Sequence, residues 1–188
     1  MDRYLDIRLR PDPEFPATVL MSALFGKLHR GLVTLATDRI GVSFPEVERE
    51  TVVGLGERLR LHGAAAELER LMVLPWLAGM EELVHVGAIT AVPNGARHRV
   101  VRRVQAKSSP ERLRRRWMKR KGFSEKEARR AVPDSVAERL DLPYVVLTSR
   151  STGQRFRLFI EHGPVRATPR DGRFNSYGLS RSGTVPWF

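Results

Sequence analysis

Histidine is the residue type in this chain that can move a proton near neutral pH, and the sequence contains five histidines. An imidazole titrates close to pH 7 and can take a proton from a hydroxyl group. His29 lies near the end of a segment with a regular apolar stripe, so it is the first candidate for a general base. The alternative is a helix-end histidine that interacts with the C-terminal dipole. The others show no metal-ligand spacing, and we expect structural roles for His62, His85, His98 and His162.

Carboxylates are scattered rather than clustered along the chain. Glu46, Glu48 and Glu50 fall in an expected loop, and Glu81 and Glu82 follow at a helix end. Two-metal nucleases need converging Asp and Glu ligands, and this spacing does not provide them. The chain also has no cysteine, no phosphate-binding loop of the Walker type and no serine nucleophile elbow. Any phosphodiester cleavage is therefore predicted to proceed without a metal, and no cofactor is expected.

Hydroxyl and aromatic side chains in the second half of the chain are further candidates. Ser149, Ser151 and Thr152 flank an expected hairpin turn, where turn-forming hydroxyls are the simpler interpretation. Phe156 follows on the next strand and could be a core residue or an exposed ring on which a base stacks. Tyr177, close to the end of the chain, is open to both interpretations.

Arg103 and Gln105 lie two residues apart on a segment that is expected to be extended. At that spacing their side chains point to the same side of the chain. Arginine matches the hydrogen-bonding edge of guanine, and glutamine matches that of adenine. The alternative is a solvated edge strand.

Positive charge is concentrated in one part of the chain. The formal net charge is +12 over 188 residues, with −2 in residues 1–98, +11 in residues 99–130 and +3 in residues 131–188. A localised basic block is typical of nucleic-acid binding. A membrane surface is the competing partner, but the block lacks a broad Leu, Phe and Ile face that could enter lipid. We therefore expect a nucleic-acid partner and no membrane partner.

The basic block centres on an expected helix. Ser109 fits an N-cap, and Pro110 and Glu111 fit the first helical turn. Leu113 and Trp117, four residues apart, form its narrow apolar stripe. A helix with so much positive charge repels itself unless a polyanion lies opposite. The cations that share the face away from the apolar stripe are Arg112, Arg115, Arg116 and Lys119.

The first ninety residues predict the order β-α-β-β-α-β. Residues 3–10 alternate apolar and polar side chains, as in a half-buried strand, and leucines recur every four residues from Leu20 to Leu32, as in a helix. This order is typical of the ferredoxin-like fold, which includes RNA-binding sheets of the RRM type but does not define a function. The expected elements are strand 3–10, helix 16–35, strand 39–44, strand 58–62, helix 64–72 and strand 84–89.

A boundary is expected at residues 93–95, Pro-Asn-Gly, which divides the chain into a ferredoxin-like domain, 1–94, and an RNA-binding domain, 95–188. The second domain is expected to hold the arginine-rich helix and a small antiparallel ribbon, so the overall class is α+β. Its expected elements are an extended segment 99–107, the helix up to Lys121, a short helix after the capping box Ser124–Glu127, a helix at 133–140, strands 143–149 and 155–162, and a further ribbon of 165–168 with 173–179.

The composition also indicates in which cellular compartment the protein works. The absence of cysteine fits a reducing cytoplasm. There is no run of about 18 apolar residues and no apolar signal core near the start of the sequence. We therefore expect a soluble cytoplasmic protein.

Several motifs, in the same order along the chain, resemble those of the type I-F CRISPR-associated repeat-processing endoribonucleases. The resemblance covers the whole chain and rests on the segments Tyr4–Pro13, Leu24–His29, Ile40–Pro45, Arg103–Ser108, Ser151–Gln154, Phe156–Ile160 and Val185–Phe188.

The resemblance implies a metal-independent RNA endonuclease without a small-molecule cofactor. Such an enzyme binds the stem-loop of a CRISPR repeat in precursor RNA, cuts once at the 3′ base of the stem, and stays on the product with the subunits of a surveillance complex. A non-catalytic subunit that binds the same RNA hairpin is the alternative.

The resemblance also implies roles for individual residues. His29 would activate a 2′-hydroxyl, Ser149 would hold its nucleotide, and Tyr177 would constrain His29 or the neighbouring sugar. Arg103 and Gln105 would read the bases at the foot of the stem. The remaining implied contacts are stacking by Phe156 and RNA binding by Lys107, Arg112, Arg115, Arg116, Lys119, Arg120 and Ser151.

Overall fold

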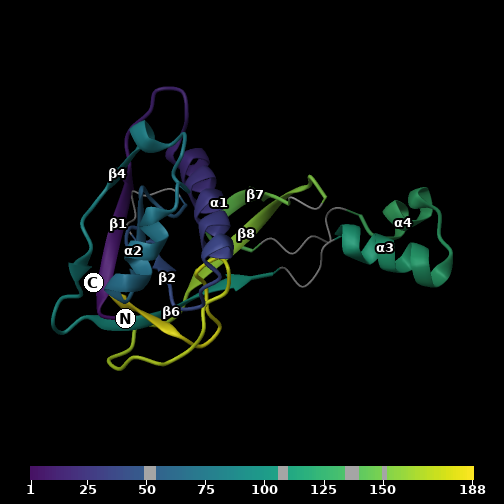
Figure 1. The fold of residues 1–188 in the computed structure, drawn as a ribbon. Coiled ribbons are helices and arrows are strands. Elements are labelled where there is room, and N and C mark those ends of the chain that lie inside the picture. The colour runs from purple at the N-terminus through teal and green to yellow at the C-terminus, as the bar shows by residue number, and fades with distance from the viewer. Residues whose placement is uncertain (49–53, 106–109, 134–139, 150–151) are drawn as a thin grey trace. The chain divides into compact units, whose positions relative to one another are not determined.

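The computed structural model describes residues 1–48, 54–105, 110–133, 140–149 and 152–188, without the side chains of residues 111 and 112. The chain divides into two compact units. We call Met1–Arg103 with Leu142–Phe188 the main unit, and Val104–Asp141 the arginine unit. Figure 1 shows the elements of each unit.

The first sheet of the main unit has five strands among the described residues. They are β1 (Arg3–Leu9), β2 (Gly41–Ser43), β3 (Arg58–Gly63), β4 (Val84–Val86), which follows the short 3₁₀ helix η1 (Glu81–Leu83), and β5 (Thr90–Ala91). The order is β2-β3-β1-β4, with β5 also paired to β1, and every pair is antiparallel. The alternation expected for residues 3–10 is confirmed, because Leu5, Ile7 and Leu9 are all buried.

Two helices, α1 (Ala17–Leu35) and α2 (Ala65–Val73), contact the strands of this sheet. The leucines that recur from Leu20 to Leu32 are buried, so the predicted apolar stripe of α1 is confirmed. The helix ends at Ala36, which adopts a left-handed conformation with φ of 53° and donates its N–H to the Leu32 carbonyl at 3.0 Å. The predicted order β-α-β-β-α-β is therefore observed, whereas the ferredoxin-like assignment stays a prediction.

The second sheet has four strands among the described residues, in the order β7-β8-β6-β9. They are β6 (Arg97–Val104), β7 (Tyr144–Thr148), β8 (Arg155–His162) and β9 (Thr184–Trp187). The predicted hairpin of β7 and β8 is confirmed by their antiparallel pairing, which places Leu147 opposite Phe156. β7 also lies along α1, as Figure 1 shows.

The prediction of a ribbon between 165–168 and 173–179 is wrong. Arg166 makes only an isolated bridge to His98, and no strand is present in residues 173–179. β6 pairs instead with β9, with Val185 fully buried opposite Arg99, so the C-terminal segment packs down on the second sheet. Pro186 is tolerated because β9 is an edge strand. Residues 173–179 instead form a turn that is important for the site described below.

The two compact units do not meet at the boundary that was expected after residue 94. Strands β7, β8 and β9 belong to the same unit as β1 to β5, because β7 packs on α1 and β9 contacts β2. The mixture of helices and antiparallel sheets confirms the α+β class. The functional division into 1–94 and 95–188 stays a prediction.

The arginine unit contains α3 (Pro110–Lys121) and α4 (Glu125–Ala131). Gly122 ends α3 with a positive φ of 67°, a conformation that glycine adopts without strain. The predicted capping box is confirmed, because Ser124 Oγ accepts from Glu127 N and the Glu127 carboxylate accepts from Ser124 N. Most of the helix expected at 133–140 lies outside the described residues.

Candidate functional site

His29 lies on α1, one helical turn after the buried Phe25. Its ring is half-buried and stacks on Tyr177, with ring centroids 4.0 Å apart and an angle of 12° between the planes. The Tyr177 ring is also parallel to that of Phe25, with centroids 6.2 Å apart. α1 continues to Leu35 and has no basic residue in its last turn, so the helix-dipole interpretation of His29 is wrong.

A backbone carbonyl determines which nitrogen of His29 carries the proton. His29 Nδ1 lies 2.8 Å from the carbonyl oxygen of Ser176. A carbonyl oxygen can only accept a hydrogen bond, so Nδ1 must be the donor. In the neutral imidazole the lone pair therefore lies on Nε2. Stacking and the hydrogen bond together fix both the plane of the ring and its tautomer, as a general base requires.

Ser149 follows β7 and belongs to the hairpin turn. Its hydroxyl accepts from Thr152 N at 3.3 Å, and its backbone N–H donates to Gln154 O at 2.9 Å, so the turn-forming interpretation is confirmed for Ser149. β7 advances along α1 in the same direction: Val146 N donates to Ser22 Oγ, and Leu147 lies against Gly26. The end of β7 thus leads towards the part of α1 that carries His29.

Phe156 and Arg103 meet on the neighbouring strands β8 and β6. Phe156 is half-buried and packs against the core, and the Arg103 guanidinium lies 5.8 Å from the centroid of its ring. Arg103 Nε is buried without a hydrogen-bond partner among the described residues. β6 lies between β8 and β9 in the sheet, but its pairing with β9 covers Arg97–Val100 and does not reach Arg103, so the alternative of a solvated edge strand stays open. Gln105 is exposed just beyond the end of β6.

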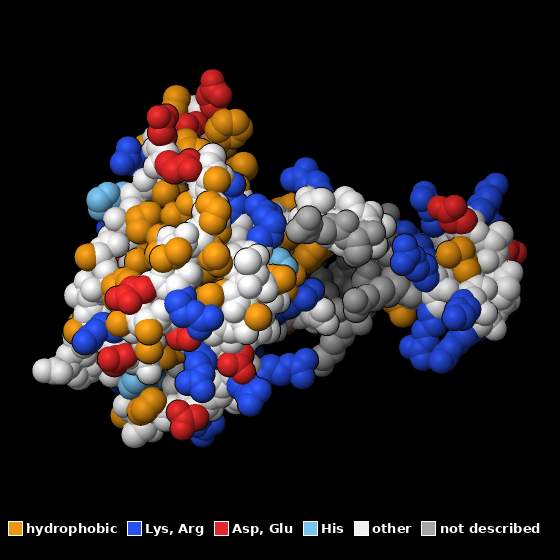
Figure 2. Space-filling model, in the orientation of Figure 1, with side chains coloured by type: hydrophobic (Ala, Val, Ile, Leu, Met, Phe, Trp, Pro, Cys, Tyr) orange, Lys and Arg blue, Asp and Glu red, His pale blue; other side chains and the backbone are white. Residues whose placement is uncertain are grey.

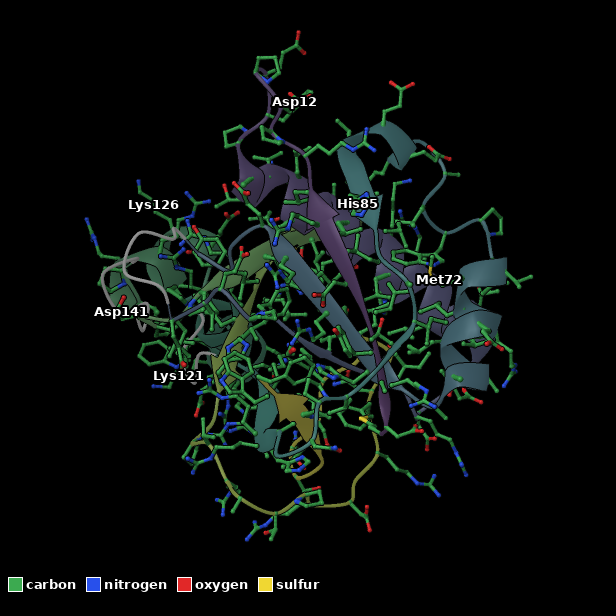
Figure 3. The ribbon with its side chains drawn as sticks, turned by 90° about the vertical axis from the view of Figure 1, so that its left-hand side faces the viewer. Asp12, Met72, His85, Lys121, Lys126 and Asp141 are labelled. Atoms are coloured by element: carbon green, nitrogen blue, oxygen red, sulfur yellow. The ribbon has the colours of Figure 1, made fainter. Side chains whose placement is uncertain are left out.

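The other histidines are differently placed. His62 is fully buried and shares a 2.8 Å hydrogen bond with Ser43 Oγ, and burial together with the charge of Arg60 lowers the pKa of His62 well below its ordinary value. Burial and the charge of Arg99 lower the pKa of His162 to about 3. Burial also lowers the pKa of His98. His85, labelled in Figure 3, is exposed on β4. Its partner in the strand pairing is Arg8.

The carboxylates that the structure brings together are paired with arginine. Arg60 makes a bidentate contact with Asp6, and Arg58 lies 3.6 Å from Asp6 and 3.5 Å from Glu46. Among the described residues, no group of three His, Asp or Glu side chains is arranged to hold a metal ion. The independence of any reaction from metals stays a prediction.

The arginine unit exposes four of the predicted cations, Arg115, Arg116, Lys119 and Arg120. Figure 2 shows Lys and Arg side chains gathered over α3 and α4. Other cations of α3 have partners within the unit: Arg114 Nε donates to Val132 O, and Lys121 lies over the ring of Trp117. Lys107, Ser151 and the side chain of Arg112 lie outside the described residues, so their predicted roles are untested.

The sequence did not point to Ser176, whose carbonyl contacts His29 from 147 positions further along the chain. A signal was present in residues 175–178, Asn-Ser-Tyr-Gly, because asparagine followed by glycine is typical of a turn. That signal locates a turn but says nothing about which side chain it meets.

Among the described residues, no helix is long and apolar enough to cross a membrane.

A histidine whose ring is oriented by a backbone carbonyl and a stacked tyrosine defines the class of sites that can perform acid–base chemistry. The sequence profile of one family, described as CRISPR-associated protein (Cas_Csy4), matches residues 4–188, and the chain belongs to this family. Two proteins named CRISPR-associated endonuclease Cas6/Csy4 are similar over the whole of both chains. The one from Pseudomonas aeruginosa is 58% identical and the one from Escherichia coli is 45% identical.

Proposed function

We propose that this protein is an endoribonuclease that processes CRISPR precursor RNA. It binds the stem-loop of the repeat, cuts the strand once at the 3′ base of the stem, and retains the product. The observation that carries the proposal is His29, held by the Ser176 carbonyl and the Tyr177 ring with Nε2 left as the basic nitrogen. The family to which the chain belongs supports it.

The proposed reaction uses the RNA's own 2′-hydroxyl as the nucleophile. His29 Nε2 takes the proton of that hydroxyl while its oxygen attacks the adjacent phosphorus. The bond to the 5′-oxygen breaks, and this oxygen takes up a proton. The products are a 2′,3′-cyclic phosphate, or the 3′-phosphate after its hydrolysis, and a 5′-hydroxyl. Intramolecular attack gains much of its rate from positioning, and a general base adds on the order of 10²–10⁴-fold, so no metal is required.

Other residues that the resemblance implies would position the RNA at the foot of its stem. Ser149 would hold the nucleotide that carries the attacking hydroxyl, and Tyr177 would keep the His29 ring and the sugar in place. Phe156 would stack under the last base pair. Arg103, whose Nε is buried without a hydrogen-bond partner in the described part of the chain, would match a guanine edge, and Gln105 an adenine edge.

The arginine unit would hold the stem itself. The exposed cations of α3 and Arg112 would contact phosphates and the groove. Lys107 and Ser151 are proposed as further RNA contacts. The major groove of A-form RNA is normally too narrow for a helix. A helix can enter where the groove opens near a loop, which favours a short stem-loop over long duplex RNA. We infer a cytoplasmic enzyme that stays on its product together with the subunits of a surveillance complex.

The test uses a labelled repeat hairpin, incubated with the protein in excess chelator and analysed on a gel. We expect one cut at the 3′ base of the stem. A hairpin with a 2′-deoxy nucleotide 5′ of the scissile phosphate should bind equally well and remain intact. Cleavage that needs an added metal, or cleavage of the deoxy hairpin, would contradict the mechanism. Tight binding without any cleavage would favour the non-catalytic subunit.

A further inference from the structure

The Ser176 carbonyl that contacts His29 belongs to a turn whose hydrogen bonds converge on Asn175. The backbone closes the turn twice, through Gly178 N to Asn175 O at 2.8 Å and Asn175 N to Leu179 O at 2.9 Å. The Asn175 side chain closes it again, because its Oδ1 accepts from Tyr177 N at 2.8 Å and from Leu179 N at 3.2 Å. Asparagine suits this position because its side chain readily bonds backbone groups two residues further on.

The Asn175 and His29 side chains hold opposite ends of one peptide unit. The carbonyl of Ser176 and the N–H of Tyr177 are parts of the same peptide group, and the described residues contain no cis peptide bond. In a trans peptide these two groups point in opposite directions. The N–H is bound by Asn175 Oδ1 and the carbonyl is bound by His29 Nδ1–H. Fixing the N–H therefore fixes the direction of the carbonyl, and hydrogen bonds in such a chain polarise and strengthen one another.

The turn is attached to the main unit on the far side of this peptide. Val42 N on β2 donates to Gly178 O at 3.0 Å, and Ser180 N donates to Val101 O at 3.0 Å. Gly178 has a positive φ of 70°, and a Cβ on it would lie 2.6 Å from Val42 Cγ1. These contacts fix where the turn lies. They do not fix the rotation of the peptide group between Ser176 and Tyr177. The Asn175 side chain fixes it through its hydrogen bond to Tyr177 N.

We propose that Asn175 is a positioning residue for His29. By holding the Tyr177 N–H it aims the Ser176 carbonyl at Nδ1, which keeps the proton there and leaves Nε2 free to accept one. This inference rests on the proposed function of His29 as the general base. Asn175 itself has no contact with RNA in this scheme, so its loss should slow cleavage without weakening the binding of the hairpin.

The experiment combines imidazole NMR with single-turnover cleavage on the full-length protein. Long-range ¹H–¹⁵N spectra of the unliganded protein report which ring nitrogen of His29 is protonated, and its signals are assigned by their loss in His29→Ala. In the wild type we expect the neutral ring to carry its proton on Nδ1. In Asn175→Ala we expect a mixture of both tautomers and a cleavage rate lower by ~10–100-fold, as for other small misplacements of a catalytic group.

Two variants make the test specific. Asn175→Asp keeps an acceptor oxygen at the same position and should restore most of the cleavage rate and the Nδ1–H tautomer. Asn94→Ala is the matched control, since Asn94 is the other asparagine of the chain and is exposed in a distant turn. All variants should bind the hairpin with the affinity of the wild type.

Two results would overturn the inference. One is a neutral His29 ring in the wild type that carries its proton on Nε2. This measurement is made on the wild type and does not depend on the folding of any variant. The other is an Asn175→Ala protein with wild-type tautomer and cleavage rate. Failure of the proposed function would be seen separately. In that case the wild type would not cleave the hairpin, or the His29→Ala variant would cleave it normally. The NMR result for Asn175 would still stand.

Discussion

The His29 site and the exposed face of α3 are built on different physical principles. His29 is held by one hydrogen bond and one stacking contact, both to residues about 150 positions away in the sequence. Arg115, Arg116, Lys119 and Arg120 are exposed side chains that follow one another on a single short helix. The first arrangement specifies an orientation, whereas the second specifies a density of charge.

This difference predicts how each region responds to change. A group that transfers a proton works only within a narrow range of distances and angles, so the loss of a single contact should have a large effect on rate. Electrostatic attraction to phosphates adds up over many contacts, so the loss of one cation should have a graded effect that depends on salt. The predictions below test this contrast, from the largest expected effect to the smallest.

Replacing His29 by alanine should lower the cleavage rate by on the order of 10²–10⁴-fold, because the general base is lost. Hairpin affinity should stay within about a factor of two, because none of the predicted phosphate contacts is removed. Single-turnover cleavage and filter binding measure the two quantities. His85→Ala is the matched control, since His85 is exposed on β4. A His29→Ala protein that lost affinity and rate to the same extent would break the contrast between the two regions.

Replacing Arg115 and Arg116 together by glutamine should weaken hairpin binding by ~10–30-fold at about 0.15 M salt, since two phosphate contacts are lost. The slope of log affinity against log salt should become shallower by about 2. Cleavage at saturating protein should hardly change. Binding titrations at several salt concentrations provide the measurement. The control is Arg8→Gln combined with Arg10→Gln, two exposed residues at β1 whose loss changes the net charge equally. An unchanged slope would mean that this face does not contact phosphates.

The two regions also differ in how far the sequence alone could predict them. The arginine helix, its end at Gly122 and the capping box after it were predicted well, because caps and apolar stripes are local patterns. The stripe of α1 and the position of His29 were predicted for the same reason. The contact of His29 with Ser176 and the pairing of β6 with β9 were missed, since no local pattern encodes which distant segments meet.

His62 shows a second limit of sequence reasoning. It forms a hydrogen bond with the Ser43 hydroxyl, the kind of pair that a proton-transfer site could use, yet both residues are fully buried. Strand pairing places Ser43 opposite Arg60 and Gly41 opposite His62, so Ser43 and His62 are diagonal neighbours in the sheet. In a strand whose two faces are both covered, apolar and polar residues do not alternate. The sequence around a histidine in such a strand therefore does not show whether its side chain is buried or exposed. His29 and His62 are therefore distinguished by their surroundings and not by the residues next to them in the chain.

The stability of the main unit should fall in mild acid because His162, which is half-buried, is neutral in the folded protein. The pKa of His162 is lowered to about 3, below its ordinary value of 6.5, so protonation favours the unfolded chain. The stability that comes from keeping this ring neutral is complete above pH 6.5 and is lost as the pH falls towards 3. The free energy of unfolding should therefore be lower by about 2 kcal/mol at pH 5 than above pH 6.5. His162→Phe, which keeps a ring against Phe44 and Trp187, should reduce the slope of unfolding free energy against pH by about one proton. Denaturant unfolding between pH 7.5 and 5 measures this slope, and identical slopes would contradict the predicted protonation.

The smallest expected effect concerns the support of the cationic face. Ser124→Ala removes the cap of α4, whose Ala128 is fully buried, and α4 packs against α3. Loss of such a cap typically costs about 1 kcal/mol. Because the exposed cations act by charge density, a looser α3–α4 pair should weaken hairpin binding by only a few fold and leave the salt slope unchanged. Hydrogen exchange of α4 amides should rise, whereas cleavage at saturating protein should not change. A large loss of affinity from this one hydroxyl would mean that the arginine unit, like the His29 site, depends on precise orientation, and the contrast between the two regions would then fail.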